Sequence, residues 1–137
     1  MGVILDANIL FRTLISSGDI TELFFNKNLE IFAPEKLREE FLNNRNEMLE
    51  KSKLSIKEFD ELTSLLFKRI TFVTLNEYQK FLPKARILLK GHTKDEDFIA
   101  VCLLKKSKLW TYEKFLFKID FGVSTKQISK NLSNTNV

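Results

Sequence analysis

The sequence predicts an α/β fold in which a short parallel sheet is covered by helices. Short apolar segments alternate along the chain with longer segments of helical pattern, the order expected when parallel strands are joined by right-handed helical crossovers. The first segment, residues 2–5, is almost continuously apolar, as is usual for a strand buried on both faces. Residues 98–104 are apolar on every side, which indicates a helix buried at the centre of the fold.

Size and composition suit one globular domain. The chain has 137 residues, of which 44% are hydrophobic and 29% charged. We predict a single domain over residues 1–132 and a disordered tail over residues 133–137, which are rich in Ser, Asn and Thr. No apolar run is long enough to span a membrane, and no basic region precedes the first apolar segment as in a secretory signal. We therefore expect a soluble, cytoplasmic protein.

Cysteine and histidine content and net charge limit the chemistry. The only cysteine, Cys102, lies among aliphatic residues and excludes both an internal disulfide and a cysteine zinc site. The only histidine, His92, lacks a partner that would complete a ligand set, so we interpret it as a loop residue. The net charge of +4 is compatible with a polyanionic partner without requiring one, because lysine-rich surfaces also serve solubility.

Five short segments have the character of strands. They are residues 2–5, 29–32, 70–74 and 108–111, with a short edge strand at Val123. The segment over residues 70–74 alternates and is β-branched, and the segment over residues 108–111 contains the only tryptophan.

Helices are expected between these strands. A helix over residues 9–16 follows the first strand and ends at the Ser17-Gly18 pair. A Ser, Thr or Asp followed three residues later by Glu has the spacing of a capping box and marks a helix start. This spacing occurs at Asp19 and Glu22, Ser55 and Glu58, and Thr93 and Glu96.

Proline positions refine the remaining helices. Pro34 suits the first position of a long helix over residues 34–51, because the N–H that proline lacks would have no partner there. The helical segment over residues 77–90 contains Pro83, which predicts a break or the start of a second short helix. A terminal helix is expected over residues 125–132.

Acidic residues stand where two of the predicted strands end. Asp6 follows the first strand directly, and Glu113 follows the strand over residues 108–111. In a parallel sheet the carboxyl ends of the strands border the crevice where ligands bind, so we expect both side chains at that edge. The alternative is that Asp6 or Asn8 simply caps the next helix, because both residue types are favoured N-caps.

The helices bring further acids toward the same edge. In the long helix Glu40 flanks the apolar face, whereas Glu39 projects to the opposite side. Asp95 and Asp97 lie in the first turn of the buried helix. The alternative is that the glutamates are solvated and that the aspartates only interact with the helix dipole. Asp95 and Asp97 cannot, however, both serve as the cap.

The convergence of these acids favours a metal site. A cluster of Asp6, Glu40 and Asp95, with Asp97 and Glu113 nearby, would be unfavourable as bare charge because like charges raise one another's pKa. Oxygen ligands without His or Cys favour Mg²⁺ or Mn²⁺, which contact phosphate oxygens and activate water for in-line attack. No glycine-rich phosphate loop, dinucleotide fingerprint or Ser or Cys nucleophile competes with this interpretation.

Four segments carry these acids and their neighbours. They are Leu5-Asp6-Ala7-Asn8-Ile9-Leu10, Leu37-Arg38-Glu39-Glu40-Phe41, Asp95-Glu96-Asp97-Phe98-Ile99-Ala100 and Leu109-Trp110-Thr111-Tyr112-Glu113-Lys114-Phe115. Their residues, order and elements resemble the motifs of the PIN domain family over nearly the whole chain. The resemblance implies a three-layer α/β/α sandwich that cleaves RNA with clustered acids and Mg²⁺ or Mn²⁺. Many single-domain members are VapC-like toxins of toxin–antitoxin pairs, so an antitoxin protein is also implied as a partner.

The resemblance assigns a role to each of seven residues. The metal-site acids are Asp6, Glu40, Asp95 and, as an accessory acid, Asp97. Asn8 and Thr111 would hydrogen-bond to carboxylates and orient them. Glu113 stands where the family usually has Asp, and its longer side chain could still reach a metal, if only through a water.

The leading hypothesis is a metal-dependent endoribonuclease whose surface lysines hold the RNA backbone. The alternative is a PIN-like module that binds RNA or a protein with little or no cleavage, which the departure at Glu113 would allow. A doubly wound phosphotransfer or phosphatase domain would need an aspartate nucleophile with a suitably placed lysine, and the sequence offers no clear candidate. The helix over residues 34–51 and the helix that begins after Ser55 would form an αα-hairpin with excess apolar surface, on which we expect a homodimer or another partner contact.

Overall fold

A five-stranded parallel sheet forms the centre of the computed structural model, which describes residues 1–16 and 18–135. The strand order is β3-β2-β1-β4-β5, and every neighbouring pair is parallel. The strands are β1 (Gly2–Leu5), β2 (Glu30–Pro34), β3 (Ile70–Val73), β4 (Lys108–Trp110) and β5 (Gly122–Val123). The predicted α/β class is therefore confirmed, and β5 is the predicted edge strand.

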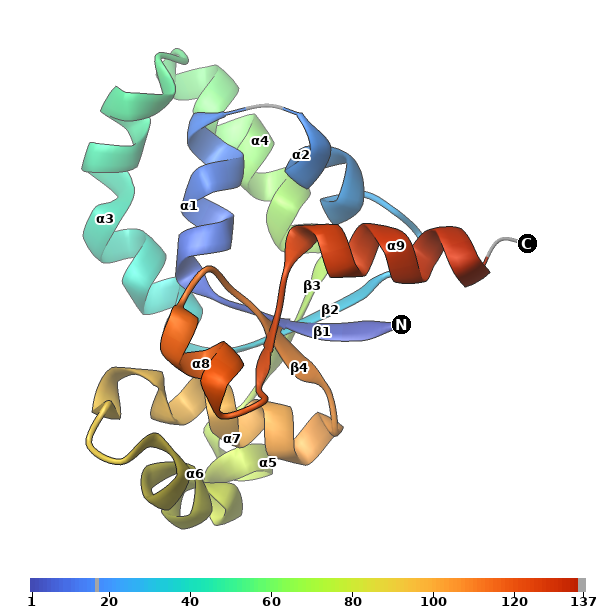
Figure 1. Cartoon of the computed structure of the whole chain (residues 1–137). Coiled ribbons are helices and arrows are strands. Elements are labelled where there is room, and N and C mark those ends of the chain that lie inside the picture. Colours follow the sequence, from blue (N-terminus) through green and yellow to red (C-terminus); the bar gives the residue numbers. More distant parts are fainter. Residues whose placement is uncertain (17, 136–137) are drawn as a thin grey trace.

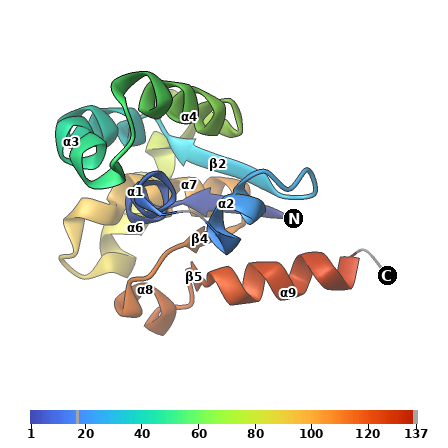
Figure 2. The ribbon, with the colours of Figure 1, turned by 90° about the horizontal axis from the view of Figure 1, so that it is seen from above.

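Helices cover both faces of this sheet, so the fold is a three-layer sandwich (Figures 1 and 2). One face carries α1 (Ala7–Ile15), α2 (Asp19–Phe24), α3 (Lys36–Ser52) and α4 (Ile56–Lys68). The other face carries α5 (Leu75–Tyr78), the 3₁₀ turn η1 (Gln79–Phe81), α6 (Leu82–Leu89), the 3₁₀ turn η2 (Thr93–Asp95) and α7 (Glu96–Lys105). The chain ends with α8 (Lys114–Lys118) and α9 (Thr125–Thr135) beside β5.

The hydrophobic core lies on both faces of the sheet. Helix α7 packs against β1, β2 and β4, and its residues 98–102 are all buried, as expected of a central helix. Trp110 on β4 is fully buried, and its indole N–H donates a hydrogen bond of 3.0 Å to Thr125 Oγ1 at the start of α9. Within the described part of the chain, no helix is both long and apolar enough to cross a membrane.

The starts of α2 and α3 differ from the prediction. Pro34 is the last residue of β2 and pairs with Val73, so α3 begins at Lys36 instead. A proline is tolerated there because the end of a strand does not need its N–H for the ladder. Asp19 is the first residue of α2 and makes no capping box, since Gly18, with a φ of +133°, occupies the N-cap position.

Other helix boundaries confirm or extend the prediction. The capping box at Ser55 and Glu58 is present, and a second one at Thr74 and Glu77 opens α5. The segment with Pro83 breaks as expected, into α5, η1 and α6. Helix α8 was not predicted. Helix α9 extends to Thr135, so residues 133–135 are helical where a tail was expected, and residues 17, 136 and 137 lie outside the described residues.

Candidate functional site: an acidic pocket at the carboxyl edge of the sheet

A small pocket of about 120 Å³ lies where the carboxyl ends of β1 and β4 meet the starts of α1, α7 and α8. Its lining includes four of the predicted acids. The lining residues are Asp6, Ala7, Asn8, Phe11, Glu40, Lys94, Asp95, Phe98 and Glu113. The structure therefore brings together side chains from four widely separated segments of the sequence.

Asp6 is fixed by the pairing of β1 with β4. Leu5 and Trp110 are register partners, and the ladder continues with a hydrogen bond of 3.1 Å from the Asp6 N–H to the Trp110 carbonyl. This pairing sets Asp6 beside Thr111, whose hydroxyl donates a hydrogen bond of 2.6 Å to Asp6 Oδ2. The same hydroxyl oxygen accepts from the Glu113 N–H at 3.0 Å. Thr111 thus orients one acid directly and the backbone of a second.

Asp6 occupies the N-cap position of α1 but does not cap the helix with its side chain. Asp6 is 5% exposed, and burial raises the pKa of its carboxylate above the ordinary 3.8. The hydrogen bond from Thr111 lowers the pKa, and the charge of Glu113 raises it again. A buried acid at a helix start that leaves the cap unused is suited to binding something else.

Asp95 shows the same pattern more strongly. It holds the N-cap position of α7 without a side-chain cap, and it is 5% exposed. Its Oδ2 atom is buried and has no hydrogen-bond partner in residues 1–16 and 18–135. Burial, together with the neighbouring charge of Glu113, raises the pKa of Asp95 to about 7. The capping box predicted at Thr93 and Glu96 does not form, because Thr93–Asp95 is a 3₁₀ turn.

Glu113 lies at the N-cap of α8, again without a side-chain cap. Its Oε1 atom lies 3.4 Å from Nζ of Lys94, a residue that the sequence analysis did not single out. The carboxylate raises the pKa of Lys94, and the Lys94 charge lowers the pKa of Asp95 in turn. The Lys94 ammonium group therefore compensates part of the negative charge of the pocket.

Glu40 enters the pocket from α3, where it is half-buried, as the predicted helical projection required. Burial raises the pKa of Glu40, the positive charge of Lys36 lowers it, and repulsion from Asp6 and Asp97 raises it. Glu40 on α3, Asp97 on α7 and Asp6 after β1 are therefore close enough to influence one another electrostatically.

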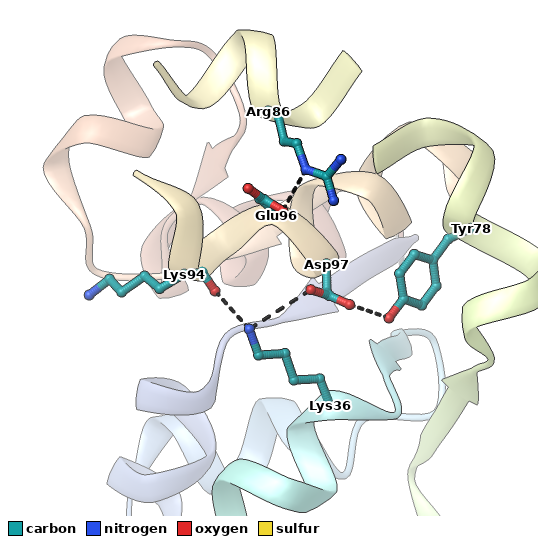
Figure 3. Close-up of polar contacts among 6 residues, drawn as sticks. All are labelled: Lys36, Tyr78, Arg86, Lys94, Glu96 and Asp97. Carbon is teal, nitrogen blue, oxygen red and sulfur yellow. Dashed lines mark hydrogen bonds and ion pairs between the residues drawn. The ribbon is translucent and has the colours of Figure 1, made fainter. Parts of the chain in front are cut away.

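Asp97 lies beside the pocket and does not line it. Its carboxylate accepts a hydrogen bond from the Tyr78 hydroxyl and lies 3.8 Å from Nζ of Lys36 (Figure 3). The Lys36 ammonium also donates to the Lys94 carbonyl at 3.4 Å, so α3 is tied to η2 as well as to α7. Asp97 therefore joins three elements around the pocket and is already committed to two partners.

Removing the Tyr78 hydroxyl tests how much its hydrogen bond to Asp97 contributes to stability. Tyr78 is 2% exposed, so Tyr78→Phe leaves one Asp97 oxygen without its donor, and we expect a loss of about 1–3 kcal/mol in the free energy of unfolding. Tyr112→Phe is the matched control, since no hydrogen bond to that exposed hydroxyl occurs among the described residues. Urea unfolding measures both variants. An equal loss of stability in the two would contradict a stabilising role for the hydrogen bond from Tyr78 to Asp97.

Asn8 lines the pocket, but within the described ranges no hydrogen bond joins its side chain to a carboxylate. The backbone N–H groups of Ala7 and Asn8, in the first turn of α1, interact with the Asp6 carboxylate and lower its pKa slightly, although neither makes a capping hydrogen bond to it. The side-chain role that the sequence suggested for Asn8 is thus absent from this arrangement, whereas the hydrogen bond expected of Thr111 is present.

The chemistry of the donors suits a hard divalent cation, although the side chains are not closed around one. Over residues 1–16 and 18–135, no three Asp, Glu, His or Cys side chains are arranged so that they could hold a metal ion. The atoms of the pocket lining that could ligate a cation are nevertheless oxygens, from four carboxylates and the Asn8 amide, and Oδ2 of Asp95 is buried without a hydrogen-bond partner in the described residues. Oxygen-only donors are those that Mg²⁺ and Mn²⁺ prefer.

The resemblance seen in four motifs extends over nearly the whole chain. A comparison with curated proteins gave no match. The family model described as PIN domain matches residues 4–134, a range that contains every strand end and helix start around the pocket from Asp6 to Glu113. Members of this family are generally nucleases and typically bind divalent metals. With nearly all of its length matched, the chain belongs to the PIN domain family.

Proposed function

We propose that the protein is a metal-dependent endoribonuclease that hydrolyses RNA phosphodiester bonds with Mg²⁺ or Mn²⁺. One observation carries the proposal. Three acids, Asp6, Asp95 and Glu113, hold the N-cap positions of three helices, face one pocket and do not cap. Their burial together raises the pKa of two of them, which destabilises the fold unless a cation is bound.

The residues in and around the pocket would have different roles in this reaction. Asp6, Asp95 and Glu40 would hold the ion, and Glu113, which lines the same pocket and interacts with Asp95, would add a longer carboxylate side chain. A bound divalent ion supplies a water activated for in-line attack and neutralises charge at the leaving oxygen. Thr111 keeps the Asp6 carboxylate oriented, and the Lys36, Asp97 and Tyr78 contacts hold α3 against α7 so that Glu40 stays in the pocket.

Partners follow from the same proposal. Lys94 is 75% exposed in its side chain and lies on the pocket wall, where an RNA phosphate would meet its charge. We further propose a homodimer through the α3–α4 hairpin, on which Leu42, Ile56 and Leu65 are each more than half exposed. A toxin role with a cognate antitoxin remains a prediction from the family resemblance.

A cleavage assay tests the central proposal. Labelled single-stranded RNA and DNA of the same sequence are incubated with the protein in Mg²⁺, in Mn²⁺ and in EDTA. We expect internal cleavage of the RNA in either metal and none in EDTA. Metal-independent binding of RNA without cleavage would instead support the alternative, a PIN-like binding module.

Lys94 should compete with the metal for the acids. Replacing Lys94 by Met removes a positive charge 3.4 Å from Glu113, so we expect Mn²⁺ to bind about two- to fivefold more tightly. The effect is modest because the Lys94 side chain is largely exposed. Lys57→Met, on the exposed side of α4, is the control and should not change the affinity. Calorimetric titration measures both, and weaker binding by Lys94→Met would contradict this role.

A further inference from the structure

A second pocket, of about 370 Å³, adjoins the acidic one. Its lining is Asn8, Phe11, Arg12, Ile15, Met48 and Tyr112. Asn8 and Phe11 line both pockets, so the two are continuous along α1. Tyr112 lines this second pocket and lies in the chain between Thr111 and Glu113, so one segment contributes to both pockets.

The side chains of this pocket combine three kinds of contact. Phe11, Ile15 and Met48 supply apolar surface, while Tyr112 is a 48% exposed aromatic ring. Arg12 is exposed, and no carboxylate of residues 1–16 and 18–135 forms an ion pair with it. Asn8 adds an amide that can both donate and accept. An exposed aromatic ring beside a free guanidinium and an amide is the combination that recognises an unpaired nucleobase and its phosphate.

We infer that this pocket binds one base of single-stranded RNA, next to the phosphate that the acids engage. The base would stack on Tyr112 over the apolar floor, Asn8 would meet its polar edge, and Arg12 would pair with the adjacent phosphate. The inference rests on the proposed function for the position of the phosphate. It adds a stacking site that selects unpaired strands, because a base in a duplex cannot leave its neighbours without a cost.

The favoured occupant is a nucleic acid because polar groups surround the aromatic ring. A helix of a protein partner would need a longer apolar stripe, and here Asn8 and Arg12 interrupt the apolar surface. Continuity with the acidic pocket also fits a nucleic acid, because the cation of the proposed function would bind a phosphate of its backbone there. A protein occupant is kept as an outcome of the test.

The test is a set of binding measurements on labelled RNA hexamers, each with a single abasic position, in Ca²⁺ to limit cleavage. For the wild type, we expect one abasic position to weaken binding about 5- to 100-fold and the others to matter less. Tyr112→Ala should weaken the intact hexamer by a similar factor and abolish that position's special effect. Tyr112→Phe keeps the ring and should behave as the wild type.

Each outcome bears on the inference separately from the proposed function. If Tyr112→Ala keeps the wild-type dependence on the abasic position, or if the wild type binds no hexamer, the base site is overturned. In that case protein docking becomes the better use of the pocket. If the wild type binds with the expected dependence but never cleaves RNA in Mg²⁺ or Mn²⁺, the base site stands and the nuclease proposal fails. Arg12→Gln gives a second variant, expected to weaken all hexamers equally.

Discussion

Asp95→Asn is expected to abolish RNA cleavage, with a fall in kcat/KM of about 1,000-fold or more. The substitution keeps the shape of the side chain but removes the negative charge of a buried carboxylate whose Oδ2 has no hydrogen-bond partner in the described residues. Asparagine offers one neutral oxygen in place of a carboxylate, so a divalent ion should bind far more weakly. Single-turnover cleavage of a labelled RNA measures the loss, and Mn²⁺ calorimetry at the same pH and salt traces it to the metal.

A matched substitution separates this effect from a general change of charge. Asp120 lies between α8 and β5, its side chain is 90% exposed, and it does not line the pocket. Asp120→Asn should therefore cleave RNA and bind Mn²⁺ as the wild type does. Wild-type activity in Asp95→Asn would show that the acids do not form the metal site. Loss of cleavage with unchanged Mn²⁺ affinity would show that Asp95 acts in the reaction without binding the metal.

The fold was largely predictable because its signals are local. Alternating strands and helices, the buried helix around residues 98–104 and the capping box at Ser55 depend on residues close together in the sequence. The spacing of a capping box alone is ambiguous, however. The pair at Asp19 and Glu22 and the pair at Thr93 and Glu96 do not form boxes, because Gly18 and a 3₁₀ turn take the cap positions.

Four of the five predicted acids line the candidate pocket, but the surroundings of the acids could not be predicted. From sequence, Asp6 and Asp95 could equally be caps or ligands, and only the structure shows that both leave the cap unused. The commitment of Asp97 to Lys36 and Tyr78 depends on contacts between distant segments, which no local pattern records. The contact between Lys94 and Glu113 could not be predicted from the sequence for the same reason.

The metal-free protein should lose stability as the pH rises from about 4 to about 8. Asp95 has a pKa of about 7 in the folded state, above its ordinary 3.8, so between these values the folded chain keeps a proton that the unfolded chain releases. Stability from this group is complete below pH 4 and is lost as the pH passes 7. Asp6 and Glu40, whose pKa values are also raised, act in the same direction.

Asp95→Asn should remove most of this dependence. Because asparagine does not titrate, the variant is expected to be more stable than the metal-free wild type at pH 8 by on the order of 2–4 kcal/mol, and about equal to it at pH 4. Urea unfolding in EDTA at both pH values measures the difference, with Asp120→Asn as the unchanged control.

Metal binding should reverse the order of the two proteins. Saturating Mn²⁺ binds the folded wild type and raises its free energy of unfolding at pH 8 by mass action, whereas Asp95→Asn gains little. Asp95 would then destabilise the metal-free protein at pH 8 and stabilise the metal-bound protein. If Asp95→Asn were instead less stable than the wild type at pH 8 without metal, its carboxylate would be supporting the fold and the pocket would be a structural feature.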